Sequence, residues 1–312
     1  MEGASAAWFS DFRYFEPREE GKDETFPYFA LLKVDGDRMG EVLARGEEQV
    51  QGGRVEDLHR AVSSALADFA DSLRTWNASL NLTALDRYEP AGKTPQLIYA
   101  GGDDVLVVCD PRDALPLAQR LQEKYEAALG PLRAMLVGDG VSAFTLSGAA
   151  LFAHTKHPAG LLLQDLETLL KRKAKGEAGR NALAVRLAKR GGVPVEVAFK
   201  WNELSDFRRL IHQLREGELS SKLSYHLRED EKVLAEVFDS AERWVGWLAD
   251  RIGRGGVGVE AAREAASLMA PLFRSGRSQA LRIARFLAVE VREWPEKEEV
   301  VAATAGAGGG VP

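Results

Sequence analysis

Residues 96–109 read QLIYAGGDDVLVVC, and two apolar runs meet there at the tetrapeptide Gly101-Gly102-Asp103-Asp104. Two adjacent ionised carboxylates at so short a turn repel each other unless a cation lies between them. Carboxylate oxygens are hard ligands, which favour Mg²⁺ or Mn²⁺. The two glycines lack Cβ atoms, so the phosphates or the base of a ligand could approach the backbone closely. This hairpin is where we expect chemistry.

A second acidic sequence, DGD at residues 35–37, follows the short apolar run at residues 28–34. If this strand lies beside the hairpin, Asp35 meets the two hairpin carboxylates at one edge of a sheet. Carboxylates placed so can hold two divalent ions about 3.5–4 Å apart for phosphoryl transfer, and the Gly36 carbonyl could face a metal. A plainer interpretation stays open, because Asp and Gly end strands routinely and the hairpin tip could simply be solvated.

Basic residues gather at the end of the helix that we expect over residues 158–175. Lys175 or Arg180 could bind phosphates there. The alternative is a solvated basic end, since cations are favourable at a helix C-terminus. Ser147 lies on an expected strand over residues 141–152. Packing is its plainer role, although its hydroxyl could face a nucleotide.

The elements around these residues predict an α+β fold, a ferredoxin-like palm in which helices cover one face of an antiparallel or mixed sheet. The expected order is strand 28–34, helix 55–76, the hairpin, helix 115–129, strand 141–152, helix 158–175, and strands 182–187 and 195–200. After Trp201 the sequence shows helical patterns near 203–216, 220–251, 257–272 and 276–294 and no convincing strand. These patterns predict a separate all-α helical bundle.

These changes in character predict four parts of the chain. They are a lead-in segment (1–27), a palm domain (28–200), a C-terminal helical bundle (201–295) and a glycine-rich disordered tail (296–312).

The composition is ordinary for a globular protein: 312 residues, 45% hydrophobic and 28% charged, with a net charge of −6. The negative charge argues against general coating of nucleic acid, though not against a local basic groove. The single cysteine, Cys109, excludes an internal disulfide and a cysteine-rich zinc site. No apolar run approaches the ~18 residues that span a membrane, and the N-terminus does not read as a secretory signal. We therefore expect a cytoplasmic location.

Three segments, YFALLKVDGDRMG, LIYAGGDDVLVV and VSAFTLSGAALFAHTKHP, together resemble the GGDEF and nucleotide-cyclase palm superfamily. More closely, they are similar to the second palm of the polymerase-like large subunit of type III CRISPR effector complexes, in the Cmr-type branch. The resemblance covers about residues 28–200. The helical segment to about residue 295 fits the C-terminal helical domain of that family at the level of architecture.

The resemblance implies a nucleotidyltransferase that joins ATP into cyclic oligoadenylate, with two Mg²⁺ or Mn²⁺ ions, when the complex binds target RNA. It implies as metal-binding and catalytic residues Asp35, Asp103 and Asp104, with the Gly36 carbonyl as a further metal ligand and Asp37 as an outer carboxylate. The nucleotide would lie against Gly101 and Gly102, with Lys175 and Arg180 near phosphate. The implied partners are the other subunits of a type III CRISPR ribonucleoprotein, guide RNA, target RNA and a separate N-terminal half that carries a first palm.

This chain departs from the family pattern, since it has no His-Asp dipeptide, one cysteine and room for a single palm. We therefore expect a fragment, a split subunit or a reduced member, without DNA cleavage. Val105 stands where diguanylate cyclases have Phe, which disfavours cyclic di-GMP synthesis. A non-catalytic scaffold or RNA-sensing subunit and a stand-alone GGDEF-like cyclase remain alternatives. Arginines near the C-terminus could meet RNA phosphates or lie solvated: Arg274, Arg277, Arg282 and Arg285.

Overall fold

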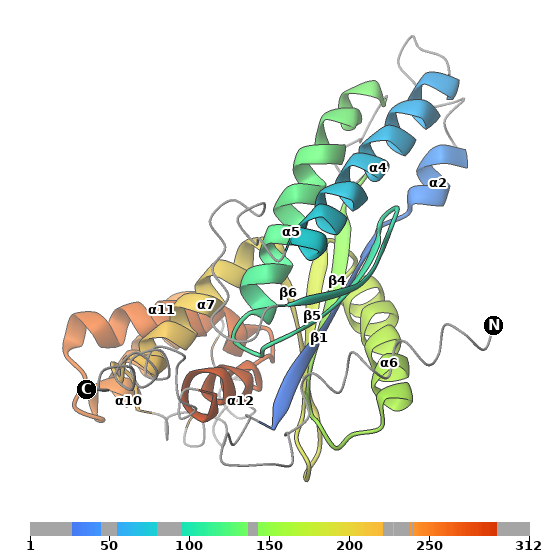
Figure 1. The fold of residues 1–312 in the computed structure, drawn as a ribbon. Helices are drawn as coiled ribbons and strands as arrows, with labels where there is room; N and C mark the ends of the chain where they lie inside the picture. The colour runs from blue at the N-terminus through green and yellow to red at the C-terminus, as the bar shows by residue number, and fades with distance from the viewer. Residues whose placement is uncertain are drawn as a thin grey trace, which may run out of the picture.

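The computed structural model describes residues 27–44, 55–79, 95–136, 143–220, 227, 238 and 240–291. Its centre is a six-stranded sheet in the order β2-β3-β1-β4-β5-β6 (Figure 1). The strands are β1 (Tyr28–Gly36), β2 (Gln96–Gly101), β3 (Asp104–Cys109), β4 (Leu146–His154), β5 (Ala182–Ala188) and β6 (Val195–Lys200). β4 and β5 run parallel and the other described pairs run antiparallel, so the sheet is mixed.

Helices lie on both faces of this sheet, so the prediction that they cover one face is wrong (Figure 1). α6 (Ala159–Thr168) and the π-helical segment η5 (Leu169–Glu177) pack on one face, and α4 (Val55–Ser79) and α5 (Ala114–Leu129) pack on the other. The reason is visible in β4, which is buried at every position. A central strand with two buried faces reads as a continuous apolar run, and each face needs its own cover.

The chain after Trp201 is helical in its described parts, as predicted. It contains α7 (Trp201–Arg215), α10 (Ala241–Gly253), α11 (Val259–Arg274), α12 (Ala280–Arg285) and η6 (Phe286–Glu290). Most of the helix expected over residues 220–251 lies outside the described residues, but its continuity is contradicted, because Ser240 has an extended backbone and caps α10. The lead-in up to residue 26 and the tail also lie outside the described residues. The remaining short elements are α2 (Met39–Ala44) and η3 (Gly130–Met135).

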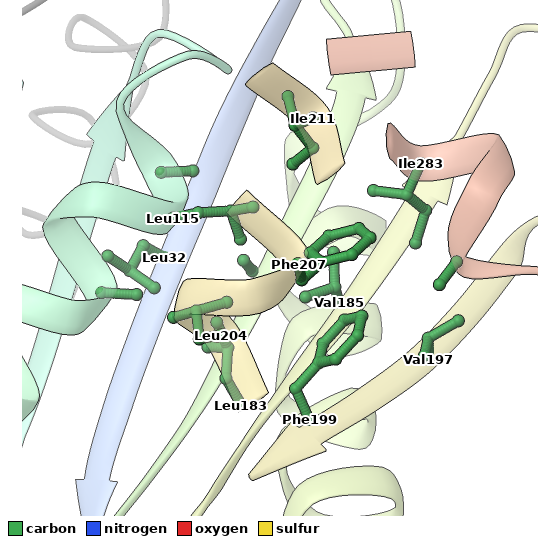
Figure 2. Close-up of a cluster of buried hydrophobic side chains, with 14 of the residues drawn as sticks. Leu32, Leu115, Leu183, Val185, Val197, Phe199, Leu204, Phe207, Ile211 and Ile283 are labelled. Carbon is green, nitrogen blue, oxygen red and sulfur yellow. The ribbon is translucent and has the colours of Figure 1, made fainter. Parts of the chain in front are cut away.

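The C-terminal helices share one apolar core with the sheet. Phe207 of α7 stacks on Phe199 of β6 with ring centroids 4.4 Å apart, and Ile283 of α12 lies beside them (Figure 2). Arg277 binds both carboxylate oxygens of Glu203, at 2.7 and 2.9 Å, so it ties the start of α12 to α7. The buried cluster thus continues across the boundary predicted at residues 200 and 201, and that division into domains stays a prediction.

The strand predicted from residue 141 begins at Leu146 in the structure. Residues 141 and 142 lie outside the described part, and Phe144 has a left-handed backbone with φ of 53°. Cys109 is buried in the core, as expected for an inert thiol. None of the helices in the described ranges has the length and apolarity needed to cross a membrane.

Candidate active site at the GGDD hairpin

The GGDD hairpin joins β2 to β3 through a two-residue turn. Gly101 pairs with Asp104, so Gly102 and Asp103 form the turn itself. Gly102 has φ of 63°, a conformation that glycine adopts without the steric cost of a side chain. On the other side of β3, Val105 pairs with Val34. This register carries Asp35 to the end of β1 beside Asp104, so the structure brings the three predicted carboxylates to one edge of the sheet.

The two hairpin carboxylates lean toward opposite faces of the sheet. Asp104 lies on the α6 side, with its Oδ2 3.4 Å from Nζ of Lys33, which also lies 2.8 Å from Glu167 of α6. Asp103 lies over Gly36 on the α5 side. A Cβ atom added at Gly36 would stand 2.9 Å from the Asp103 Cβ and 2.8 Å from the Tyr125 hydroxyl. The Asp103 side chain thus occupies the space that a Cβ atom on Gly36 would need.

We expect Gly36→Ala to displace Asp103, because the new methyl group would overlap the Asp103 side chain and the Tyr125 hydroxyl. Overpacking of this kind costs about 1–3 kcal/mol of folding free energy. The measurements are chemical denaturation and the ATP turnover of the assembled complex. Gly160→Ala is the matched control, since a Cβ atom at Gly160 meets nothing within 4 Å. Wild-type turnover in Gly36→Ala would contradict the close placement of Asp103.

Burial is the main cause of the raised carboxyl pKa values at this edge of the sheet. It raises the pKa of Asp103, and the charge of Asp35 raises it further, against the pull of Lys175. Burial also raises the pKa of Asp104, against the nearby ammonium of Lys33. One oxygen of Asp104 (Oδ1) and the Tyr125 hydroxyl are buried with no hydrogen-bond partner among the described residues. Added positive charge here would relieve both the repulsion and the missing partner.

Lys175 is the cation that faces Asp35. Its Nζ donates to Asp35 Oδ2 at 2.5 Å and to the Gly36 carbonyl at 2.8 Å, and lies 3.8 Å from Asp37 Oδ1. The side chain is 16% exposed. Lys175 therefore contacts two of the predicted metal ligands directly, a pairing that sequence reasoning did not foresee.

Asp37 joins three segments of the chain at the base of the site. Its carboxylate is 1% exposed and accepts hydrogen bonds from the hydroxyls of Thr145 and Ser147, at 2.8–2.9 Å, and from the Asn181 amide at 3.0 Å. Ser147 is fully buried, so the expectation that its hydroxyl faces a nucleotide is not supported. The hydroxyl binds Asp37 instead. Sequence reasoning missed Thr145 and Asn181, and the alternation of Thr145 with Ser147 around the start of β4 was the available signal.

The loop after η5 has an unusual backbone. Gly179, Arg180 and Asn181 all lie in the left-handed region, with φ of 71°, 67° and 46°. A non-glycine residue rarely adopts this conformation, and it persists when surrounding contacts impose it. Here the amide of Asn181 binds Asp37, and the Arg180 carbonyl accepts a bond from Lys200 at 2.6 Å. The loop carrying Arg180 is thus held at the same edge as the carboxylates.

Whether a divalent cation suits these residues can be judged from the donors themselves. The available ligands are the carboxylates of Asp35, Asp103 and Asp104 and the carbonyl of Gly36, all hard oxygens of the kind that Mg²⁺ and Mn²⁺ prefer. Among these oxygens, Oδ1 of Asp104 is buried without a hydrogen-bond partner in the described residues and is available to a cation. Within the described ranges, no three His, Cys, Asp or Glu side chains are already gathered as a metal site. These oxygen ligands fit a hard cation, although the side chains of Asp103 and Asp104 lean toward opposite faces of the sheet.

Comparison with solved structures finds matches at low identity, and the three described here have TM-scores below 0.5. The Csm1–Csm4 cassette in complex with AMPPNP is 15% identical, with a TM-score of 0.48 over 87% of this chain and 39% of that chain. The same cassette with one ATP gives a TM-score of 0.47 at 15% identity, over 87% of this chain and 39% of that one. The apo state of a type III-B Cmr-beta complex gives 0.44 at 14% identity, over 80% and 36%.

Sequence comparison identifies the family. The chain is 28% identical over 227 residues to the CRISPR system Cmr subunit Cmr2 of Pyrococcus furiosus. This alignment covers 65% of this chain and 24% of that protein. The match thus spans about a quarter of the curated relative's length. The family model for the Cas10/Cmr2 second palm domain matches residues 28–184, half of this chain, and includes both the DGD and the GGDD motif. The chain therefore belongs to the Cas10/Cmr2 second palm domain family.

Proposed function

We propose that this chain is the nucleotidyltransferase palm of a type III CRISPR effector, which converts ATP to cyclic oligoadenylate when the complex binds target RNA. One observation carries the proposal: the register of β1 and β3 brings Asp35 to the side of the GGDD hairpin. Carboxylates from two strands at a single edge of the sheet can hold divalent ions. Such ions would stabilise the charge on a transferring phosphoryl group. Membership of the palm family agrees with this chemistry.

The proposed roles follow from where the residues lie. Asp35, Asp103, Asp104 and the Gly36 carbonyl would hold two Mg²⁺ or Mn²⁺ ions. Such ions, when bound, activate the attacking ribose hydroxyl and neutralise charge on the α-phosphate.

The chain's own groups position the nucleotide. Gly102 leaves the backbone of the hairpin open to a nucleotide, since a Cβ atom there would meet nothing within 4 Å. The Tyr99 side chain lies over Gly101, so a nucleotide would contact Gly101 only after Tyr99 moves. Arg180, on the loop that the Asn181 amide holds to Asp37, would bind phosphate, and Lys175 would do so after leaving Asp35. The proposed partners are the other subunits of the effector, guide RNA, target RNA and a first palm on another segment or polypeptide. A cytoplasmic location belongs to the same proposal.

A non-catalytic scaffold is the second candidate, and one observation favours it. The ammonium of Lys175 already binds Asp35 and the Gly36 carbonyl. In a scaffold the charges of the DGD and GGDD motifs would serve the fold alone. A stand-alone GGDEF-like cyclase is the third candidate.

The test is ATP turnover with Mg²⁺ or Mn²⁺, with products resolved by mass. The chain is assayed alone, then in the assembled complex with and without target RNA, with GTP in parallel. Adenylate rings that need target RNA would support the proposal. Products from the chain alone, with ATP or GTP, would favour a stand-alone cyclase. A complex that binds target RNA but forms no product would favour the scaffold.

A further inference from the structure

The cation nearest the β1 end of the site is part of the chain itself. Lys175 reaches from η5 and places its ammonium between Asp35 Oδ2, at 2.5 Å, and the Gly36 carbonyl, at 2.8 Å. Asp37 Oδ1 lies 3.8 Å from the ammonium and adds a second carboxylate beside it. The other ammonium described at this edge, Lys33, lies with Asp104 and Glu167 on the α6 side. Lys175 is thus the counter-ion of Asp35 and a hydrogen-bond donor to the Gly36 carbonyl in this conformation.

A divalent ion on the same oxygens excludes this arrangement. Mg²⁺ binds its oxygen ligands at about 2.0–2.1 Å, closer than the ammonium lies, so the two cations compete for these oxygens. An ammonium left beside a divalent ion would also repel it, strongly so at a site that is partly shielded from water. Lys175 therefore competes with a divalent ion for Asp35 Oδ2 and the Gly36 carbonyl. A triphosphate would offer the displaced ammonium a new anionic partner.

We propose that Lys175 is a built-in cation that holds the Asp35–Gly36 site in the absence of metal, so that a divalent ion binds by exchange with it. The inference rests on the proposed function for the identity of the metal ligands. Its consequence is that the metal-free protein is stable although three carboxylates lie at one edge. A second consequence is that metal alone binds weakly, whereas metal and triphosphate are favoured together, because the triphosphate receives the displaced ammonium.

The direct test is Mn²⁺ binding without nucleotide, followed by electron paramagnetic resonance of the free ion, in the full 312-residue chain. We expect Lys175→Met to bind Mn²⁺ about tenfold or more tightly than the wild type, because the competing charge is gone. Lys175→Arg keeps the charge and should stay close to the wild type. Lys171→Met is the matched control, since Lys171 lies on the same segment but is 72% exposed and pairs with Glu167. Equal or weaker Mn²⁺ binding by Lys175→Met would overturn the proposal.

A second measurement on the wild-type chain needs no variant that might fold poorly. Lysine acylation is followed by mass spectrometry at saturating Mg²⁺ without nucleotide. Acylation of Lys175 should rise severalfold over the metal-free sample, while acylation of Lys171 should not change. Unchanged protection of Lys175 while Mg²⁺ is bound would refute the exchange. Cyclic oligoadenylate synthesis is a separate readout, so a failed exchange together with normal synthesis would leave the proposed function standing.

Discussion

The Asp103→Asn/Asp104→Asn double variant is expected to lose ATP turnover by about 10³-fold or more in the assembled, target-bound complex. The two carboxylates are the proposed metal ligands of the hairpin, and neutral amides cannot balance the charge of two divalent ions. Product formation resolved by mass is the measurement. The matched control is Asp250→Asn, which removes a carboxylate paired with Arg254 on the surface of α10. Full turnover by a folded double variant would assign the carboxylates a role other than catalysis.

The same double variant should be at least as stable as the wild type at neutral pH. Burial raises the pKa of Asp103 and of Asp104, so folding favours their protonated forms. Protonation of these carboxyl groups stabilises the folded state fully at a pH below their ordinary pKa. This contribution is lost as the pH rises through their raised pKa in the folded protein. Asparagine resembles the protonated form at every pH. We therefore expect a melting temperature about 1–2 °C higher without metal at pH 7, with the gain shrinking toward pH 4. A lower melting temperature at pH 7 would contradict this account.

Asp37→Ala is expected to lower the free energy of unfolding by about 3 kcal/mol. The carboxylate is buried and receives two hydroxyl groups and one backbone amide. Its removal leaves the buried hydroxyls of Thr145 and Ser147 without this partner and releases the left-handed loop that carries Arg180. Chemical denaturation measures the loss, and hydrogen exchange of the amides at residues 179–181 reports the release of the loop.

Ser147→Ala separates the anchoring role of Asp37 from a general effect of cavity formation. It removes one donor and leaves Thr145 and Asn181 on the carboxylate, so it should cost about 1 kcal/mol and leave exchange in the loop nearly unchanged. The expected order is thus a large effect for Asp37→Ala and a small one for Ser147→Ala. Equal costs for the two variants, or slow exchange in the loop of Asp37→Ala, would show that Asp37 does not anchor it.

The sequence alone determined the turn, the order of the elements and the family. The GGDD hairpin could be placed because two apolar strands flank a turn that needs glycine, and these are local properties of the chain. The meeting of Asp35 with the hairpin was predicted on the condition that strand 28–34 lies beside the hairpin, and the pairing of β1 with β3 meets that condition. Helical periodicity likewise identified α4, α5 and α7. The motifs then identified the palm family, which the comparison confirmed.

The tertiary structure decided which face each side chain occupies and which groups neutralise one another. Ser147 binds the buried Asp37, although a serine on a strand could as well have faced a ligand. Lys175 binds Asp35 across 140 residues of sequence, and Asp103 and Asp104 lean toward opposite faces although they are adjacent. Local periodicity cannot encode such pairings, because they depend on the register of β1 with β3 and β4 and on the side from which η5 approaches.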